Sequence, residues 1–234
     1  MARINLERRA AIGEAKRART RAAILEAARA CYAAPEPVSA TVDAVTQAAG
    51  VAKGTFYLHF RDLPALEAEL GETLIAELSE RLEPARLAVD NPLTRMATAV
   101  TILLRDLAAA PAQARLAARA AVMLPDVAQA VQARLRGDLA DAQADGLLAV
   151  GSVDLAVRIV VALVEQASSL FSTSRIDATA IPDIVRAVLR AMGCPPGDAA
   201  NRTDEAALNA DAFAQRTSAV AGAVSRIHQT NQVE

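Results

Sequence analysis

Aromatic residues are scarce in this sequence, and tryptophan is absent. Aromatic residues make up 3% of the 234 positions, whereas hydrophobic residues as a whole make up 53%. The core must therefore be built from alanine, leucine, valine and isoleucine, and an alanine-rich composition favours closely packed helices. Such a composition excludes disorder of the whole chain. A pocket formed by these residues would have aliphatic walls rather than stacked rings.

Cysteine and histidine each occur only twice. Cys31 and Cys194 lie far apart and lack the spacing of metal ligands, so a disulfide framework is not indicated and a reducing cytoplasm is favoured. The sequence has no glycine-rich phosphate loop, no helix carrying two metal-binding histidines and no cysteine–histidine pair near a base. We therefore expect no enzyme activity, no metal and no cofactor.

A long uninterrupted hydrophobic run is also missing. The most apolar stretch, Val153 to Leu170, is broken by Asp154, Arg158 and Glu165, so we expect it to be too short and too charged to span a bilayer. The basic N-terminus is not followed by an apolar segment, unlike a signal peptide. These features predict a soluble, cytoplasmic protein without a membrane partner.

Charge is distributed unevenly along the chain. Residues 1–61 contain ten Lys and Arg against five acidic residues, a net charge of +5, and the whole chain carries −2, which leaves −7 for the remainder. A basic N-terminal module on an acidic body suits a protein that places one end on nucleic acid phosphates. By itself, the charge pattern fits a solvated surface equally well.

Hydrophobic periodicity predicts an all-α fold. The expected helices cover residues 17–33, 41–49, 53–58, 62–82, 93–109, 111–123, 125–145, 154–172 and 181–192. Residues 1–16 would form a loosely ordered basic arm or a frayed extension of the first helix. Residues 198–234 are rich in small and polar side chains and would form either a weak amphipathic helix lying back on the body or a disordered tail.

Residues 41–60, TVDAVTQAAGVAKGTFYLHF, have the pattern of two short helices around a tight turn. Val45 lies on the apolar face of the first helix, and Gly50 can adopt the positive φ that the turn needs. The second helix is too short to be stable alone, so Phe56 and Phe60 must anchor it to its neighbours. Its polar residues would then face outward, as in a recognition helix that enters the major groove.

The run GVAKGTFYLHF at residues 50–60, following Thr41-Val42 and Ala49, resembles the signature of the TetR family of one-component transcriptional regulators. With its flanking helices the resemblance covers roughly residues 17 to 70. The alternative is an ordinary helical hairpin of a bundle. The resemblance implies an N-terminal helix-turn-helix three-helix head on a larger helical body. The expected divisions are a basic arm (1–16), a DNA-binding domain (17–61), a ligand-binding and dimerisation domain (62–194) and a C-terminal extension (195–234).

The resemblance also assigns DNA-contacting positions. Four residues match positions that commonly donate hydrogen bonds to phosphate, namely Thr41, Thr55, Tyr57 and His59. Lys53 and Gly54 match positions that approach base edges, where Lys can donate to guanine and Gly allows close backbone approach. Tyr57 would alternatively be a partly buried core aromatic, and His59 a simple surface histidine.

Three departures from the family pattern bear on this interface. Ala52, which the resemblance also places among the DNA-binding positions, stands where the family often has Ser or Thr. The recognition helix therefore lacks a side-chain cap, at a cost of about 1 kcal/mol. Thr46 replaces a small Ala, and its hydroxyl could bond back to the carbonyl four residues earlier. Leu63 replaces a Lys that often touches phosphate, a role that Arg61 could take.

The resemblance finally implies a homodimer, a palindromic DNA operator and a small-molecule effector. The dimer would form through helices at about 154–172 and 181–192, whose apolar faces are wider than one stripe, although an intramolecular core would also explain them. Two recognition helices would then lie about 34–36 Å apart. Candidate pocket residues are Arg105, Arg119, Met123, Glu165 and Gln166, which would otherwise be exposed or satisfied within an interface.

We therefore expect a dimeric repressor of the TetR type that an effector releases from its operator. The repressor role, rather than an activator role, comes from the family alone. Two other classes remain: an all-helical enzyme or ligand carrier, and an adaptor that acts through protein partners.

Overall fold

The computed structural model describes residues 2–33, 41–123 and 129–230, and in these ranges all regular structure is helical. The elements are α1 (Ala2–Ala33), α2 (Val42–Ala49), α3 (Lys53–His59), α4 (Leu63–Leu87), α5 (Pro92–Ala109), α6 (Pro111–Met123), α7 (Gln129–Ala144), α8 (Val153–Ser172), a single 3-10 turn (Ala178–Ala180), α9 (Ile181–Ala191) and α10 (Pro196–Thr230). The predicted all-α fold is confirmed.

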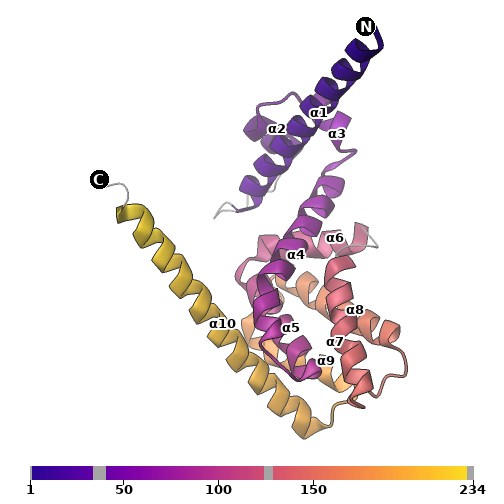
Figure 1. Ribbon diagram of the computed structural model, residues 1–234, viewed down its shortest axis with the longest axis vertical. Helices are drawn as coiled ribbons and strands as arrows, with labels where there is room; N and C mark the ends of the chain where they lie inside the picture. The colour runs from indigo at the N-terminus through magenta and orange to yellow at the C-terminus, as the bar shows by residue number, and fades with distance from the viewer. Residues whose placement is uncertain (1, 34–40, 124–128, 231–234) are drawn as a thin grey trace.

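The chain is arranged as a small head and a larger body joined by α4 (Figure 1). The head comprises α1, α2, α3 and the first turns of α4, and the body comprises the rest of α4 and α5 to α10. The head core is formed by Ile24, Ala28, Tyr32, Val45, Phe56, Phe60, Leu66, Leu70 and Leu116. Leu116 belongs to α6 of the body, so the two parts share buried side chains.

Local signals in the sequence set the boundaries of the head helices. Thr41 caps α2, because its hydroxyl accepts the backbone N–H of Ala44 at 3.1 Å. Gly50 ends α2 in the left-handed conformation with φ of 64°, as predicted. The side chain of Asp62 caps α4 by accepting the N–H of Ala65 at 2.8 Å. These caps fix where each short helix begins and ends.

Helices α4 and α6 approach each other closely at Gly71. A β-carbon at this position would lie 2.1 Å from the backbone oxygen of Leu116 and 2.7 Å from the β-carbon of Ala120. Both neighbours are rigid parts of α6, so only glycine allows this crossing. Arg115 of α6 also lies over the ring of Tyr32 in α1, with its guanidinium carbon 5.3 Å from the ring centroid. Helix α6 therefore touches the head and α4 at one place.

Helices α8 and α9 supply much of the body core. The apolar residues that had suggested a dimer face lie inside one protomer. Six of them are buried, namely Val157, Val160, Ile181, Val185, Val188 and Leu189. The other four, Val153, Val161, Val164 and Ile184, are partly buried. The intramolecular explanation therefore accounts for these positions. The outward faces of the two helices consist of other residues, which include Leu155 and Ala162 on α8 and Ala187 on α9.

Three segments differ from the sequence-based boundaries. Helix α1 begins at Ala2, so residues 2–16 extend the first helix rather than forming a loose arm. Helix α4 continues through Pro84 to Leu87, although proline removes one backbone hydrogen bond. Residues 196–230 form the long helix α10. Its Phe213 packs against Leu82 of α4, which helps to hold the last turns of α4 in place.

By length and composition alone, α8 could cross a membrane, so the expectation that this stretch is too short and too charged was wrong. In the structure, α8 packs against α5, α6, α7 and α9. Its buried side chains, among them Ala156, Val160 and Phe171, belong to the main core of the body. A helix from a protein core can be as long and as apolar as a membrane span, and the packing of α8 supports the assignment as a core helix.

Replacing Gly71 with Ala should force α4 away from α6. We expect the free energy of unfolding to fall by about 1–3 kcal/mol, because the added methyl group overpacks a rigid contact. The matched control is Gly137→Ala on α7, where a β-carbon meets nothing within 4 Å. This control should raise stability slightly. Urea denaturation of both variants measures the difference, and a Gly71→Ala protein as stable as Gly137→Ala would show that the contact can relax.

Candidate nucleic-acid interface and effector cavity

Helix α3 is anchored by two phenylalanines and is open on its other side. Phe56 is fully buried, Phe60 is 3% exposed, and their ring centroids lie 5.7 Å apart. By contrast, Tyr57 and Leu58 are 51% and 71% exposed. The residues predicted to carry the contacts at the start of the helix, Ala52, Lys53 and Gly54, are also exposed. The helix therefore presents its N-terminal end and one face to solvent.

Arginines of α1 hold α3 and α4 in position. Arg17 donates to the backbone oxygen of Leu58 at 3.3 Å, which satisfies a carbonyl at the C-terminal end of α3. The guanidinium of Arg21 lies 4.5 Å from the ring centroid of Phe60 and pairs with both carboxylate oxygens of Glu69 in α4. Such a bidentate pair fixes the orientation of the Arg21 guanidinium and also compensates its charge.

Lys53 is not free in the structure. Its ammonium lies 2.8 Å from a carboxylate oxygen of Asp43 in α2, and this hydrogen bond raises the pKa of Lys53. The pair is exposed to solvent, so it is weak and can exchange for a DNA partner. Asp43 therefore holds the Lys53 side chain across the turn before DNA is bound.

The remaining predicted phosphate contacts lie around the same helix pair. Thr41 is exposed, whereas Thr55 and His59 are half-buried. Burial lowers the pKa of His59, and the positive charges of Arg17 and Arg21 lower it further. A neutral histidine ring can still donate one N–H to phosphate. Tyr57 is not a core aromatic, because half of its surface is exposed, although its ring makes a T-shaped contact with that of Phe56.

The structure resolves the local effects of the three family departures. Ala52 is the N-cap of α3 and provides no side-chain hydrogen bond, as predicted. The hydroxyl of buried Thr46 donates to the backbone oxygen of Val42 at 2.8 Å, also as predicted. Arg61 is 70% exposed beside Asp62, with 3.2 Å between Arg61 Nε and the carboxylate. Its role as a phosphate contact in place of Leu63 stays a prediction.

Sequence reasoning missed Asp43 and the internal use of the α1 arginines. It counted Arg17, Arg21 and Arg29 as part of a basic surface, but Arg21 pairs with Glu69, and Arg29 pairs with Glu77 at 2.7 Å. A signal was present in the spacing of these residues, because Arg21 and Arg29 are eight residues apart and so are Glu69 and Glu77. Lys16 and Arg19 are exposed, and no ion pair involves them within the described chain.

The body contains a cavity of about 170 Å³ between α4, α5, α6, α7 and α8. Its walls are mainly aliphatic and include Ile75, Leu103, Leu107, Leu135 and Val164. Among the described residues that line it, none is aromatic, in agreement with the composition of the chain. Helix α4 contributes five lining residues from Ile75 to Arg86, so the wall of the cavity includes the helix that carries the head.

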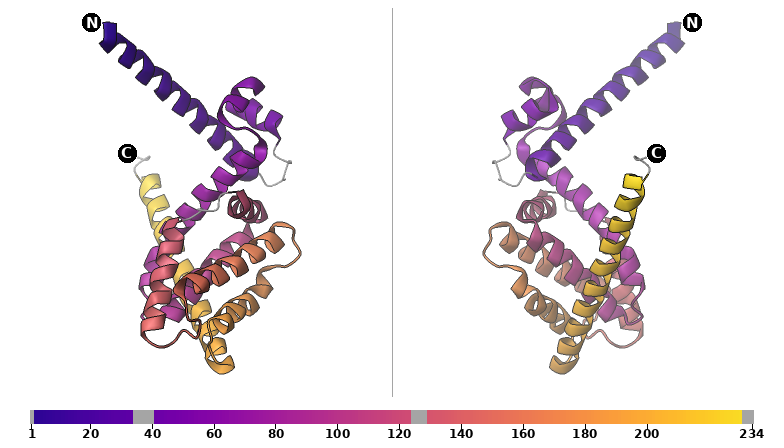
Figure 2. Two further views of the ribbon diagram at one scale, coloured as in Figure 1. Left: turned by 90° about the vertical axis from the view of Figure 1, so that its right-hand side faces the viewer. Right: turned by 90° about the vertical axis from the view of Figure 1, so that its left-hand side faces the viewer.

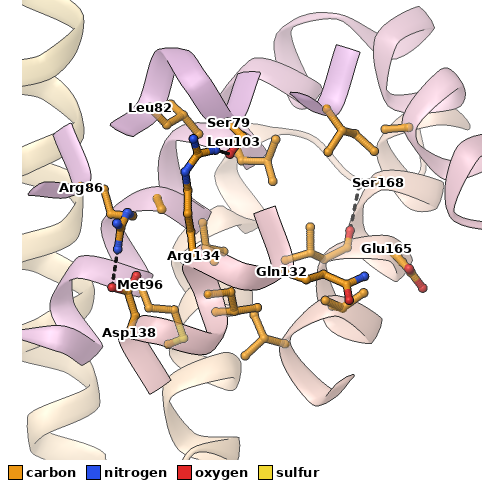
Figure 3. A pocket seen from close by; sticks show the side chains of 18 of the residues that line it. Ser79, Leu82, Arg86, Met96, Leu103, Gln132, Arg134, Asp138, Glu165 and Ser168 are labelled. Atoms are coloured by element: carbon orange, nitrogen blue, oxygen red, sulfur yellow. Dashed lines mark hydrogen bonds and ion pairs between the residues drawn. The ribbon is translucent and has the colours of Figure 1, made fainter. Parts of the chain in front are cut away.

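One side of the cavity is lined by paired charges (Figure 3). Arg86 donates to both carboxylate oxygens of Glu83 at 2.9 Å and also to Asp138, which is 2% exposed. Arg134 donates to Ser79 and to Glu80 at 2.5 Å each. The hydrogen bonds from Arg86 lower the pKa of Glu83, which keeps this carboxylate ionised.

The predicted pocket residues have different positions. Glu165 lines the cavity. Arg105 does not, because it extends from α5 to Asp211 of α10 at 2.7 Å. Gln166 is exposed on α8 and is not a lining residue. Arg119 and Met123 fall on α6, but their side chains lie outside the described part of the structure. Sequence reasoning missed the Arg86–Asp138 pair, because no local pattern links α4 to α7.

The fold and the exposed helix α3 define a helix-turn-helix DNA-binding protein with an internal cavity in its body. Residues 24–66 match the family described as bacterial regulatory proteins, tetR family. The head is therefore a TetR-family DNA-binding domain. No significant match was found among curated protein sequences.

Solved structures extend this likeness to the whole fold. RolR in complex with resorcinol is similar with a TM-score of 0.65 and 20% sequence identity, over 81% of this chain and 95% of RolR. Thermus thermophilus FadR, a TetR-family repressor in complex with lauroyl-CoA, has a TM-score of 0.57 and 18% identity, over 75% of this chain and 96% of FadR. FadR from Bacillus halodurans has a TM-score of 0.55 and 17% identity, over 74% of this chain and 98% of that FadR. The body thus has the fold of TetR-family regulators.

Replacing Gly54 with Ala should change DNA affinity without lowering the stability of the fold. A β-carbon at Gly54 meets nothing within 4 Å, so the variant should be at least as stable as the parent protein. If the backbone of Gly54 approaches base edges, the methyl group should weaken DNA binding about tenfold or more. Thermal unfolding and fluorescence anisotropy with operator DNA measure the two effects. Gly137→Ala, the same change on α7, should leave DNA binding intact, and equal affinity of both variants would remove Gly54 from the interface.

Proposed function

We propose that the protein is a dimeric transcriptional repressor that binds a palindromic operator and is released by a small molecule. The observation that carries this proposal is the presentation of Lys53, Gly54 and Tyr57 on a helix whose opposite face is locked by Phe56 and Phe60. Such a helix can enter the major groove without rearrangement of the head. The regulator would act in the cytoplasm, where its DNA is found.

The position of the cavity supports control by a small molecule. Helix α4 forms part of the cavity wall from Ile75 to Arg86 and continues into the head core at Leu66 and Leu70. A ligand that binds better to one placement of α4 would shift the population of head positions. RolR binds resorcinol and T. thermophilus FadR binds lauroyl-CoA, so ligands of different sizes are bound by proteins of this fold.

The outward face of α8 supports a dimer. Leu155, Ile159, Ala162 and Leu170 lie on one side of this helix at helical spacing, and none of them is fully buried. On α9, Ala187 and Ala191 are exposed. Small and apolar side chains on two neighbouring helices suit close packing against a second copy. We infer a four-helix contact in which this outward face, rather than the buried valines, meets the partner.

Operator binding can be tested with the DNA upstream of the protein's own coding region. The parent protein should protect a palindrome in footprinting, and its affinity should fall about a thousandfold between 50 and 200 mM salt if about six phosphates are neutralised. The double variant Lys53→Ala/Tyr57→Ala should lose this protection, whereas Arg105→Ala in the body should keep it. Unchanged protection by the double variant would contradict the assignment of α3 as the recognition helix.

The dimer is tested by Ala162→Arg, which places a long charged side chain at the centre of the α8 outward face. We expect the mass in solution to change from twice the chain mass of 24.4 kDa to the monomer mass. Ala140→Arg, at an exposed position of α7, is the matched control. Analytical ultracentrifugation gives both masses. A dimer that survives Ala162→Arg would move the interface elsewhere.

A further inference from the structure

The size of the cavity limits what it can hold. A volume of about 170 Å³ is close to that of the engineered apolar cavity that accommodates benzene, which indicates an occupant of roughly six to ten non-hydrogen atoms. The aliphatic walls formed by residues such as Leu103, Leu135 and Val160 favour an apolar body that gains affinity by leaving water. A small molecule with an apolar body and one polar end fits this space better than a large ligand.

The arginines of the cavity are already neutralised by the protein. Arg86 and Arg134 line it, and Arg95 lies 3.4 Å from Asp138, so three cations gather on this side. Their carboxylate partners are Glu80, Glu83, Asp138 and Asp141, one more than the arginines. An anionic ligand would have to break these pairs to reach a guanidinium, and for Arg86 this would leave the buried Asp138 carboxylate uncompensated, which is costly. This side therefore offers no net positive charge for a carboxylate or phosphate.

Glu165 lies on the other side of the cavity, away from the arginines (Figure 3). It lines the cavity from α8, and in the described part of the chain it makes no hydrogen bond or ion pair. Glu165 is an exposed residue at the edge of the cavity; its partial burial raises its pKa, and no neighbouring cation opposes this effect. An unpaired carboxylate at an apolar cavity attracts a hydrogen-bond donor, most strongly a cationic one.

We propose that the effector of this protein is a small aliphatic amine whose ammonium group pairs with Glu165 while its apolar body fills the cavity. This inference rests on the proposed function, because it identifies the ligand of this cavity with the effector. Neutral alcohols of the same length bind more weakly, and carboxylates bind weakest because they meet Glu165 and the paired charge cluster.

Three six-carbon probes test the charge preference: hexylamine, 1-hexanol and hexanoate, each titrated calorimetrically into the full-length protein at pH 7 without DNA. Hexylamine should bind about threefold more tightly than hexanol, as for a solvent-accessible ion pair. Hexanoate should bind at least about tenfold more weakly than hexylamine. Glu165→Gln should remove the advantage of the amine over the alcohol, and Glu72→Gln, at an exposed position of α4, should not.

Two further measurements locate the binding and separate it from regulation. Val164→Phe, which fills the cavity, should weaken all three probes, provided that thermal unfolding shows an intact fold. Tightest binding of hexanoate, no binding of any probe, or a preference that survives Glu165→Gln would overturn the inference. Release of footprinted operator by hexylamine is scored separately. Amine binding that leaves operator occupancy unchanged would refute the effector role while the charge preference of the cavity stands.

Discussion

The close crossing of α4 and α6 at Gly71 is the constraint on which the arrangement of the protein depends. Because position 71 has no side chain, the backbone of α6 lies against α4, and Leu116 and Arg115 reach the head core. A movement of α4 in the body therefore cannot leave the head unaffected. Packed helices with so little free space shift as units rather than deforming gradually, which is what transmission over a long helix requires.

The long helix α10 restrains the other end of α4. The two views of Figure 2 show α10 running along the body, and its residues Ala210 and Phe213 form a small core with Leu82 and Ala85 of α4. Polar contacts also attach α10 to the start of α5, since Arg202 donates to Asn91 at 2.5 Å and to Thr94 at 3.0 Å. Helix α4 is thus held by α6 near the head and by α10 near its end, with the cavity between these two contacts.

Charged residues have internal uses that the net charge of the head conceals. Two arginines of α1 pair with glutamates of α4, and a third closes the end of α3. The basic excess is therefore only partly available to DNA, and it falls on exposed residues such as Lys16, Arg19 and Arg61. In the cavity, carboxylates pair with the arginines, and among the described lining residues Glu165 is the charged side chain without an ion-pair partner.

The sequence by itself determined the all-helical class, the turn at Gly50, the capping by Thr41 and the anchoring role of Phe56 and Phe60, because each of these depends on residues close together in the chain. The tertiary structure decided which charges are paired, which face of α8 remains outside and where the cavity lies. Asp138 pairs with Arg86, 52 residues away in the sequence. Helix α4 continues through Pro84 because side chains distant in the sequence pack against its neighbours Leu82 and Ala85. Such contacts follow from the packing of whole helices, which no local pattern encodes.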